Sequence, residues 1–264
     1  MEMKGKVIVV TGGGSGIGAA LVRRFAREGA AGLVVADLDG ARAEAVAAEV
    51  GGLAVRTDVS QETEVQALID RATAQFGRVD VLCSNAGIAL GGGPAAPDDD
   101  WQRSWDVNVM AHVWGARAVL PQMLARGEGY LLQAASAAGL LSHPESATYA
   151  VSKHAAVAFA EWLAMNHGDQ GIRVSCLCPQ GVNTNMLNSG DLTGDNPATS
   201  VVRSAGAVLE PAEVADVTLD AITEERFLVL PHPEVLTYLQ RKAADPARWL
   251  AGMRKLQARM ADPA

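Results

Sequence analysis

Two side chains with acid–base chemistry stand four residues apart near the middle of the chain. Tyr149 and Lys153 lie in a stretch of helical character, and Ser136 precedes Tyr149 by thirteen residues. On a helix this spacing places the phenol and the ammonium on one face, where the positive charge can lower the pKa of the phenol from about 10. The pair predicts proton exchange near neutral pH, although the same spacing also occurs in plain surface pairs.

A glycine-rich run indicates what holds a cofactor beside this pair. The run from Gly12 to Gly18 lies between a β-branched segment and a helical pattern. Glycines in that context permit a tight turn, let the backbone approach a pyrophosphate, and aim a helix N-terminus at its negative charge. We expect the contacts in this run to come from Gly12, Ser15, Gly16, Ile17 and Gly18.

An acidic residue favours one form of the dinucleotide. Asp37 ends the second β-branched segment, nineteen residues after Gly18. A carboxylate there can accept hydrogen bonds from the adenosine ribose and would repel the 2′-phosphate of NADP. Neither Ser15 nor Leu38 supplies a positive charge to attract that phosphate. The sequence therefore predicts NAD as the cofactor.

The elements that position these residues alternate along the chain. We predict strands at 6–11, 32–37, 53–57, 79–84, 129–135, 172–178 and 226–230, and helices that include 18–27, 41–50, 62–76 and 107–126. Strand followed by helix, repeated, is typical of a parallel sheet covered on both faces. We expect an α/β fold: a doubly wound, seven-stranded parallel sheet in three layers, as a single domain over residues 1–264.

Three further segments bear on a pocket. The irregular stretches at 89–100 and 183–200 follow strand ends, so we interpret them as a pocket rim and a substrate lid at about 183–205; plain surface loops are the alternative. A helical C-terminal extension is expected at about 231–264. Its apolar stripe is Trp249, Met253, Leu256 and Met260. We expect this stripe to pack on the core or on a sister subunit, with roofing of the active site as the alternative.

Composition excludes several classes of partner. A formal net charge of −8, with 49% hydrophobic and 20% charged residues, fits a soluble globular chain and argues against nucleic acid or an anionic membrane. No signal peptide and no apolar run long enough for a membrane span is visible, so a cytoplasmic location is expected.

No metal site is expected. The histidines lack ligand spacing, and the three cysteines sit in apolar segments as small buried residues. We expect Cys176 and Cys178 to face opposite sides of their strand, which would prevent a shared metal.

Several motifs together carry a family resemblance over nearly the whole chain. The glycine-rich run, Asn85-Ala86-Gly87, Asn108, Ser136 and the segment from Tyr149 to Lys153 occur in order at the expected strand and helix positions. In this respect the chain resembles the short-chain dehydrogenase/reductase family, in its short, single-domain, NAD-dependent branch, whose fold is Rossmann-like.

The resemblance implies four catalytic residues. Tyr149 would be the general acid/base, and Ser136 would hydrogen-bond the same substrate oxygen. Lys153 would lower the pKa of Tyr149 and hold the nicotinamide ribose. Asn108 would hold a water that links Lys153 to solvent, or would simply satisfy local backbone groups.

The resemblance also implies further cofactor contacts. They would come from Asp58, Val59, Asn85, Ala86, Gly87, Pro179, Gly181, Val182 and Thr184. Asp58 would meet the adenine amino group, or would be a helix-start carboxylate near Ser60. Gln180 departs from the family pattern, which has a glycine most often at this position, and its side chain either enters the substrate pocket or points to solvent.

The substrate pocket is predicted to be apolar. Its expected residues are Ser136, Ala138, Leu140, Leu141, His143, Tyr149, Gln180, Met186 and Leu187. We see no arginine or lysine placed to hold a carboxylate, and His143 either binds a polar group or caps a loop. These features predict an uncharged, apolar secondary alcohol or ketone.

We therefore predict an NAD-dependent alcohol dehydrogenase or ketoreductase, acting on the CH–OH group of a small molecule and assembled, as the family implies, as a homotetramer. An apolar face on the 107–124 helix would support that assembly. The alternatives are a non-catalytic dinucleotide sensor and a sugar-nucleotide-type epimerase or dehydratase; the latter usually carries a larger C-terminal domain.

Overall fold

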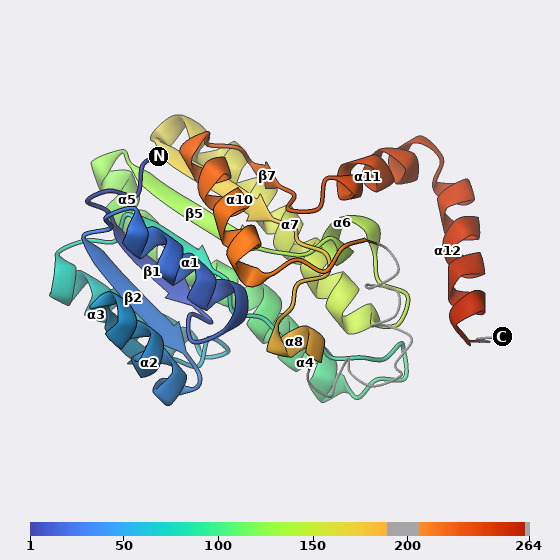
Figure 1. The fold of residues 1–264 in the computed structure, drawn as a ribbon, viewed down its shortest axis with the longest axis horizontal. Coiled ribbons are helices and arrows are strands. Elements are labelled where there is room, and N and C mark those ends of the chain that lie inside the picture. Colours follow the sequence, from blue (N-terminus) through green and yellow to red (C-terminus); the bar gives the residue numbers. More distant parts are fainter. Residues whose placement is uncertain (189–205, 262–264) are drawn as a thin grey trace.

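A seven-stranded parallel sheet forms the centre of the computed structural model, which describes residues 1–188 and 206–261 (Figure 1). The strand order is β3-β2-β1-β4-β5-β6-β7. The strands are β1 (Val7–Thr11), β2 (Gly32–Asp37), β3 (Leu53–Arg56), β4 (Val81–Ser84), β5 (Gly129–Ala134), β6 (Ile172–Leu177) and β7 (Leu228–Val229). Each lies within the segment predicted for it, so the doubly wound sheet is confirmed.

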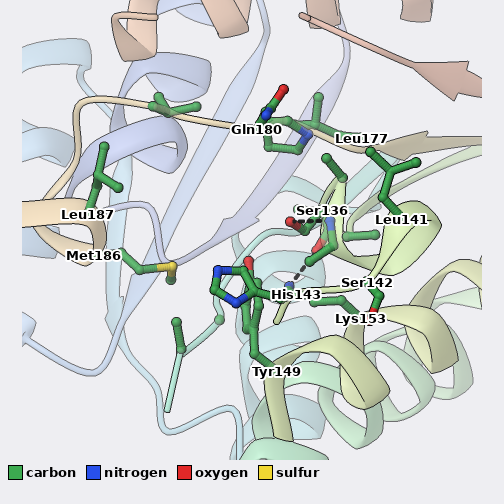
Figure 2. A pocket seen from close by; sticks show the side chains of 18 of the residues that line it. Ser136, Leu141, Ser142, His143, Tyr149, Lys153, Leu177, Gln180, Met186 and Leu187 are labelled. Carbon is green, nitrogen blue, oxygen red and sulfur yellow. Dashed lines mark hydrogen bonds between the residues drawn. The ribbon is translucent and has the colours of Figure 1, made fainter. Parts of the chain in front are cut away.

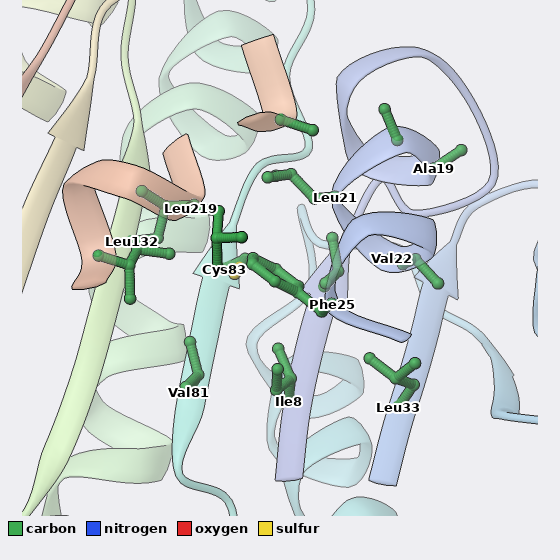
Figure 3. Packing of buried hydrophobic residues seen from close by; sticks show 14 of the residues in the cluster. Ile8, Ala19, Leu21, Val22, Phe25, Leu33, Val81, Cys83, Leu132 and Leu219 are labelled. Carbon is green, nitrogen blue, oxygen red and sulfur yellow. The ribbon is translucent and has the colours of Figure 1, made fainter. Parts of the chain in front are cut away.

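Helices cover both faces of the sheet because its strands are apolar on both sides. On one face lie α1 (Gly16–Arg27), α2 (Gly40–Val50) and α10 (Pro211–Thr223); on the other lie α3 (Glu62–Phe76), α5 (Ala111–Arg126) and α7 (Ala147–His167). In β1, Ile8 and Val10 pack on the first side and Val9 on the second. Figure 3 shows Phe25 of α1 directed at the strands that carry Ile8 and Val81.

Two boundaries differ from the sequence prediction. Helix α4 (Asp98–Trp105) begins inside the stretch expected to be irregular, and its first turn holds three aspartates, which favour a helix N-terminus. The helix expected at 107–126 starts instead as a π-helical turn, Asp106–Met110, that leads into α5. Such turns often occur at functional sites, and this one carries Asn108.

The cysteine prediction for β6 is wrong. The sulfur atoms of Cys176 and Cys178 are 3.7 Å apart and both residues are buried. Residues two apart on a strand share a face, so these two side chains point to the same side of the sheet.

Four further helices of the described residues lie around the carboxyl edge of the sheet or beyond it: α6 (Ala138–Leu141), α8 (Asn185–Asn188), α11 (Glu234–Ala244) and α12 (Pro246–Ala261). The 3₁₀ turn Gly168–Gln170 lies at the opposite edge, just before β6. Helix α11 contacts α6, and α12 packs on α11, so the C-terminal helices extend outward from the sheet (Figure 1). Within the described residues, no helix has the length and apolar character needed to cross a membrane.

Candidate active site

The predicted site residues gather at the carboxyl ends of the strands. The glycine-rich run follows β1, Asn85 follows β4, Ser136 follows β5 and Pro179 follows β6. The strand order reverses between β1 and β4, and open parallel sheets bind ligands at such a point.

Helix α7 presents the acid–base pair to this edge. Ser146 precedes the helix and accepts a hydrogen bond from the backbone N–H of Tyr149 at 3.3 Å, which fixes the first turn. The Nζ atom of Lys153 lies 5.8 Å from the centroid of the Tyr149 ring. The prediction that the two side chains share one helix face is confirmed.

The prediction for the pKa of Tyr149 is wrong for this structure. Burial raises the pKa of the phenol, and a hydrogen bond with Ser136 only partly opposes that rise. Burial also lowers the pKa of Lys153 to about 8. The charge of Lys153 by itself favours a lower pKa of the phenol, but the cost of removing both groups from water acts in the opposite direction.

A tight cluster holds Lys153 in place. Lys153 is only 3% exposed, and its Nζ donates to the carbonyl of Ala134 at 2.9 Å. A Cβ atom on Gly87 would stand 3.3 Å from that Nζ and 3.2 Å from Oδ1 of Asn108, closer than ordinary van der Waals contact, so a larger residue there would press on both groups.

Asn108 braces the neighbouring loop. Its Oδ1 accepts from the backbone N–H of Ile88, and its Nδ2 donates to the carbonyl of Ile88, each at 2.9 Å. Nδ2 also donates to Ser152 on α7 at 3.0 Å. The structure therefore shows the local bracing role, while the water link to Lys153 stays a prediction.

Ser136 sits at the base of the pocket. Its Oγ accepts a hydrogen bond from the backbone N–H of Ala138 at 3.1 Å, and the N–H of Ala137 donates to the carbonyl of Pro179 at 2.9 Å. These bonds join the segments after β5 and β6. The hydroxyl of Ser136 lines the same cavity as Tyr149, and its proximity works to lower the pKa of that phenol.

The glycine-rich run fits a dinucleotide phosphate. A Cβ atom on Gly18 would stand 2.1 Å from the carbonyl oxygen of Gly12, and Gly12 itself has a φ of 63°. Ser15 precedes α1 without a capping hydrogen bond from its side chain, so the first N–H groups of α1 keep the capacity to bind an anion. Asn85 secures the loop by donating from Nδ2 to the carbonyl of Thr11 at 2.9 Å.

The residues predicted for the adenosine end lie at the ends of β2 and β3. Oδ2 of Asp37 accepts from the N–H of Gly14 at 2.9 Å, and Leu38 beside it is exposed. Asp58 accepts from the hydroxyl of Ser60 at 2.7 Å, which is the helix-start alternative given above. Val59 is buried against Val65 and Ala111.

A cavity of about 430 Å³ opens above Ser136 and Tyr149 (Figure 2). Ala138, Leu141, His143, Gln180, Met186 and Leu187 line it, as predicted. Leu140 does not, because on the short helix α6 its side chain packs into the core while Leu141 faces the cavity. Most of the expected lid, residues 189–205, lies outside the described residues.

The C-terminal extension bears on two predictions about this cavity. Tyr238 and Arg241 of α11 and Trp249, Met253 and Leu256 of α12 form part of its wall, which is the roofing alternative. Trp249 also packs against the buried cluster of Ala137, Leu141 and Val235, so the stripe meets the core as expected as well. An arginine does line the pocket, contrary to prediction. The side chain of Met260 lies outside the described part of the chain.

His143 faces the cavity and has a defined structural role there. The Nδ1 atom of His143 accepts from the N–H of Glu145 at 3.3 Å, and burial lowers its pKa, so a neutral ring with a proton on Nε2 faces the cavity. The ring lies edge-on to Tyr149, with 6.4 Å between centroids.

His232 has a role at the site that was not predicted from the sequence. Buried after β7, its Nδ1 accepts from the N–H of Gln180 at 3.1 Å and its Nε2 reaches the carbonyls of Gly181 and Ala207, each at 3.1 Å. The Pro231-His232-Pro233 sequence was the available signal. Oε1 of Gln180 is buried and has no hydrogen-bond partner among the described residues.

Comparisons with known proteins agree with this geometry. A family model described as short chain dehydrogenase matches residues 6–193. The chain is 36% identical over 259 residues to 1-deoxy-11-beta-hydroxypentalenate dehydrogenase of Streptomyces exfoliatus, covering 93% of this chain and 90% of that protein. It is 34% identical over 221 residues to meso-2,3-butanediol dehydrogenase of Serratia marcescens, covering 82% and 87% of the two chains.

Solved structures show the same likeness. A short chain dehydrogenase/reductase from Burkholderia phymatum, solved in complex with NAD, superposes with a TM-score of 0.83 at 35% identity. The match covers 93% of this chain and 95% of that one.

Proposed function

Because the chain belongs to the short-chain dehydrogenase family, whose relatives above are named as dehydrogenases of hydroxylated compounds, we propose that it is an NAD-dependent oxidoreductase. It interconverts an apolar secondary alcohol and its ketone. The observation that carries the proposal is the meeting of Ser136, Tyr149 and Lys153 at the base of one cavity.

The protein's own residues divide the proton chemistry. Ser136 donates a hydrogen bond to the substrate oxygen and Tyr149 takes its hydroxyl proton in oxidation, returning it in reduction. Lys153, held by Ala134, keeps a positive charge beneath the phenol at neutral pH, which favours the phenolate as it forms. When bound, NAD supplies the nicotinamide ring that accepts the hydride.

We assign the cofactor as NAD because of the environment of Asp37. Its carboxylate lies at the end of β2 and accepts from the N–H of Gly14 in the glycine-rich run, which is the position from which a carboxylate can bind an adenosine ribose. Asp37→Ala should raise the ratio of kcat/KM with NADP to that with NAD by about tenfold or more, because it removes the repulsion of the phosphate. The ratio is measured in steady state. A ratio equal to wild type would show that another residue sets the preference.

We further propose that the protein is a homo-oligomer, a tetramer in keeping with the sequence prediction. Trp162 and Met165 on α7 are 49% and 75% exposed, and apolar patches of this kind often mark protein interfaces. Light scattering coupled to gel filtration measures the molar mass and therefore the oligomeric state. A monomer would refute this part alone.

The decisive test of the proposed activity is Tyr149→Phe. This variant should bind NAD as wild type does and oxidise secondary alcohols about a hundred- to ten-thousand-fold more slowly, because it lacks the proton acceptor. Absorbance of the reduced nicotinamide measures turnover, and calorimetry measures NAD binding. Undiminished turnover would refute the mechanism. Absence of turnover in wild type across aliphatic, cyclic and steroid alcohols would favour a sensor, or an epimerase or dehydratase, instead.

A further inference from the structure

The cavity is lined mainly by apolar side chains, but the charged side chains among its described lining residues are all positive. Lys153 and Arg241 are the two cations among the described residues that line it, and no aspartate or glutamate does. Lys153 is buried at the base, committed to Ala134 and placed under Tyr149. Arg241 is exposed at the outer rim, on the C-terminal helix α11. An anion entering the outer part of this cavity would therefore meet a positive charge, and no carboxylate of the described residues lines the cavity to compete for it.

Arg241 is available for such an anion. Its side chain makes no ion pair or hydrogen bond within the described part of the protein. Asp245, one helical turn later, uses Oδ1 to accept from the backbone N–H of Arg248 at 2.9 Å. The adjacent cation is already occupied, since Nζ of Lys242 donates to the carbonyl of Leu140 at 2.6 Å. Within the described ranges 1–188 and 206–261, the guanidinium of Arg241 therefore has no partner at the rim.

The packing of α11 directs Arg241 to the cavity. Val235 is buried against Ala137 and Leu141, which anchors α11 on α6. Tyr238 and Arg241 are three residues apart and share the face of α11 that lines the cavity. The Tyr238 ring contacts Trp249 of α12, with 6.4 Å between centroids.

The space between the two cations is apolar. The residues that line it include Leu141, Leu187, Trp249, Met253 and Leu256. A ligand that spans it needs an apolar body, with the reacting hydroxyl at Tyr149 and any charged group at the opposite end.

From this arrangement, and resting on the proposed function, we infer that the substrate is an apolar hydroxy acid. Its carboxylate pairs with Arg241 at the rim while its secondary alcohol lies at Ser136 and Tyr149. A guanidinium suits a carboxylate because it can form two parallel N–H···O bonds with it.

The test compares matched acids and amides on matched variants. The probes are 4-hydroxycyclohexanecarboxylate and lithocholate, each with its primary amide, so that two body lengths are covered. Affinity is measured by calorimetry on the NAD-loaded protein for wild type, Arg241→Gln and Arg248→Gln. Arg248 is an exposed cation of α12 outside the cavity lining and serves as the control.

For at least one pair, wild type and Arg248→Gln should bind the acid more tightly than the amide, by about three- to tenfold for a pair this exposed to water. Arg241→Gln should lose that preference while keeping its affinity for the amide. Raising the salt concentration should weaken the preference in wild type. Equal affinity for acid and amide in wild type, an unchanged preference in Arg241→Gln, or binding of neither pair would overturn the inference.

Turnover of the amides separates this inference from the proposed function. If wild type oxidises an amide but shows no preference for the acid, the dehydrogenase activity stands and the role of Arg241 falls. If the acid preference depends on Arg241 but neither compound is oxidised, the anion subsite stands and the proposed activity is in doubt.

Discussion

The base and the outer wall of the cavity are built by different means. At the base, Lys153 and Asn108 are buried and joined by hydrogen bonds to the backbone of Ala134 and Ile88. At the outer wall, Trp249, Met253 and Leu256 are half-buried on α12, which packs mainly on α11. The side chains at the base are thus fixed by hydrogen bonds to backbone beside the sheet, whereas the outer wall is held mainly by packing between two helices.

The largest effect should follow from removing the cation at the base. Lys153→Met should lower kcat by about a hundred- to ten-thousand-fold, because the phenolate of Tyr149 would form without a neighbouring positive charge. The control is Lys242→Met on α11, which should keep kcat within about twofold on small alcohols. Steady-state kinetics measures both. Equal losses of kcat in the two variants would show that the base of the cavity contributes no more to catalysis than the outer wall.

A pH series tests whether Lys153 is as strongly desolvated as its burial indicates. Its pKa is about 8 in the folded protein and near 10.5 when unfolded, so between these values the unfolded chain binds more protons. The contribution of Lys153 to the free energy of unfolding therefore rises with pH across this window, by about 3 kcal/mol in total.

The contribution of Lys153 to the free energy of unfolding is isolated by comparing wild type with Lys153→Met. Desolvation raises the pKa values of Tyr149 and Cys83, which lowers the stability of wild type as pH increases, and we expect the same in Lys153→Met. The free energy of unfolding of wild type minus that of Lys153→Met, from denaturant titrations at pH 8 and 10.5, removes this background. No change in that difference would mean that water reaches Lys153.

The smallest effect should come from the outer wall. A chain that ends at Asp245 lacks α12 and should show kcat/KM for a steroid alcohol reduced by about tenfold, through KM, since Trp249, Met253 and Leu256 no longer cover the apolar body. NAD affinity should not change. A fall in kcat for small and large alcohols alike would place α12 in the catalytic machinery.

The features that could be predicted from the sequence are those of the strands, the glycine-rich run and the base of the cavity. The strands and the glycine-rich run were predictable because their signals are local: β-branched segments, and glycines between a strand and a helix. The shared helix face of Tyr149 and Lys153 follows from their spacing alone.

The failures depend on contacts between distant segments. The pKa of Tyr149 reflects burial by elements far away in the chain. Arg241 reaches the cavity only because Val235 packs on Leu141, nearly a hundred residues earlier. His232 matters because it binds the backbone of Gln180 and Gly181. No local pattern encodes these contacts.

The central claim is that the base of the cavity performs the chemistry and the C-terminal wall selects the substrate. It is tested most directly by kcat for the smallest cyclic secondary alcohol that wild type oxidises, measured side by side in Tyr149→Phe and in the chain that ends at Asp245. The account predicts a loss of about a hundredfold or more in Tyr149→Phe and a change within about twofold in the shortened chain. Similar losses in both proteins, or full activity of Tyr149→Phe, would contradict it.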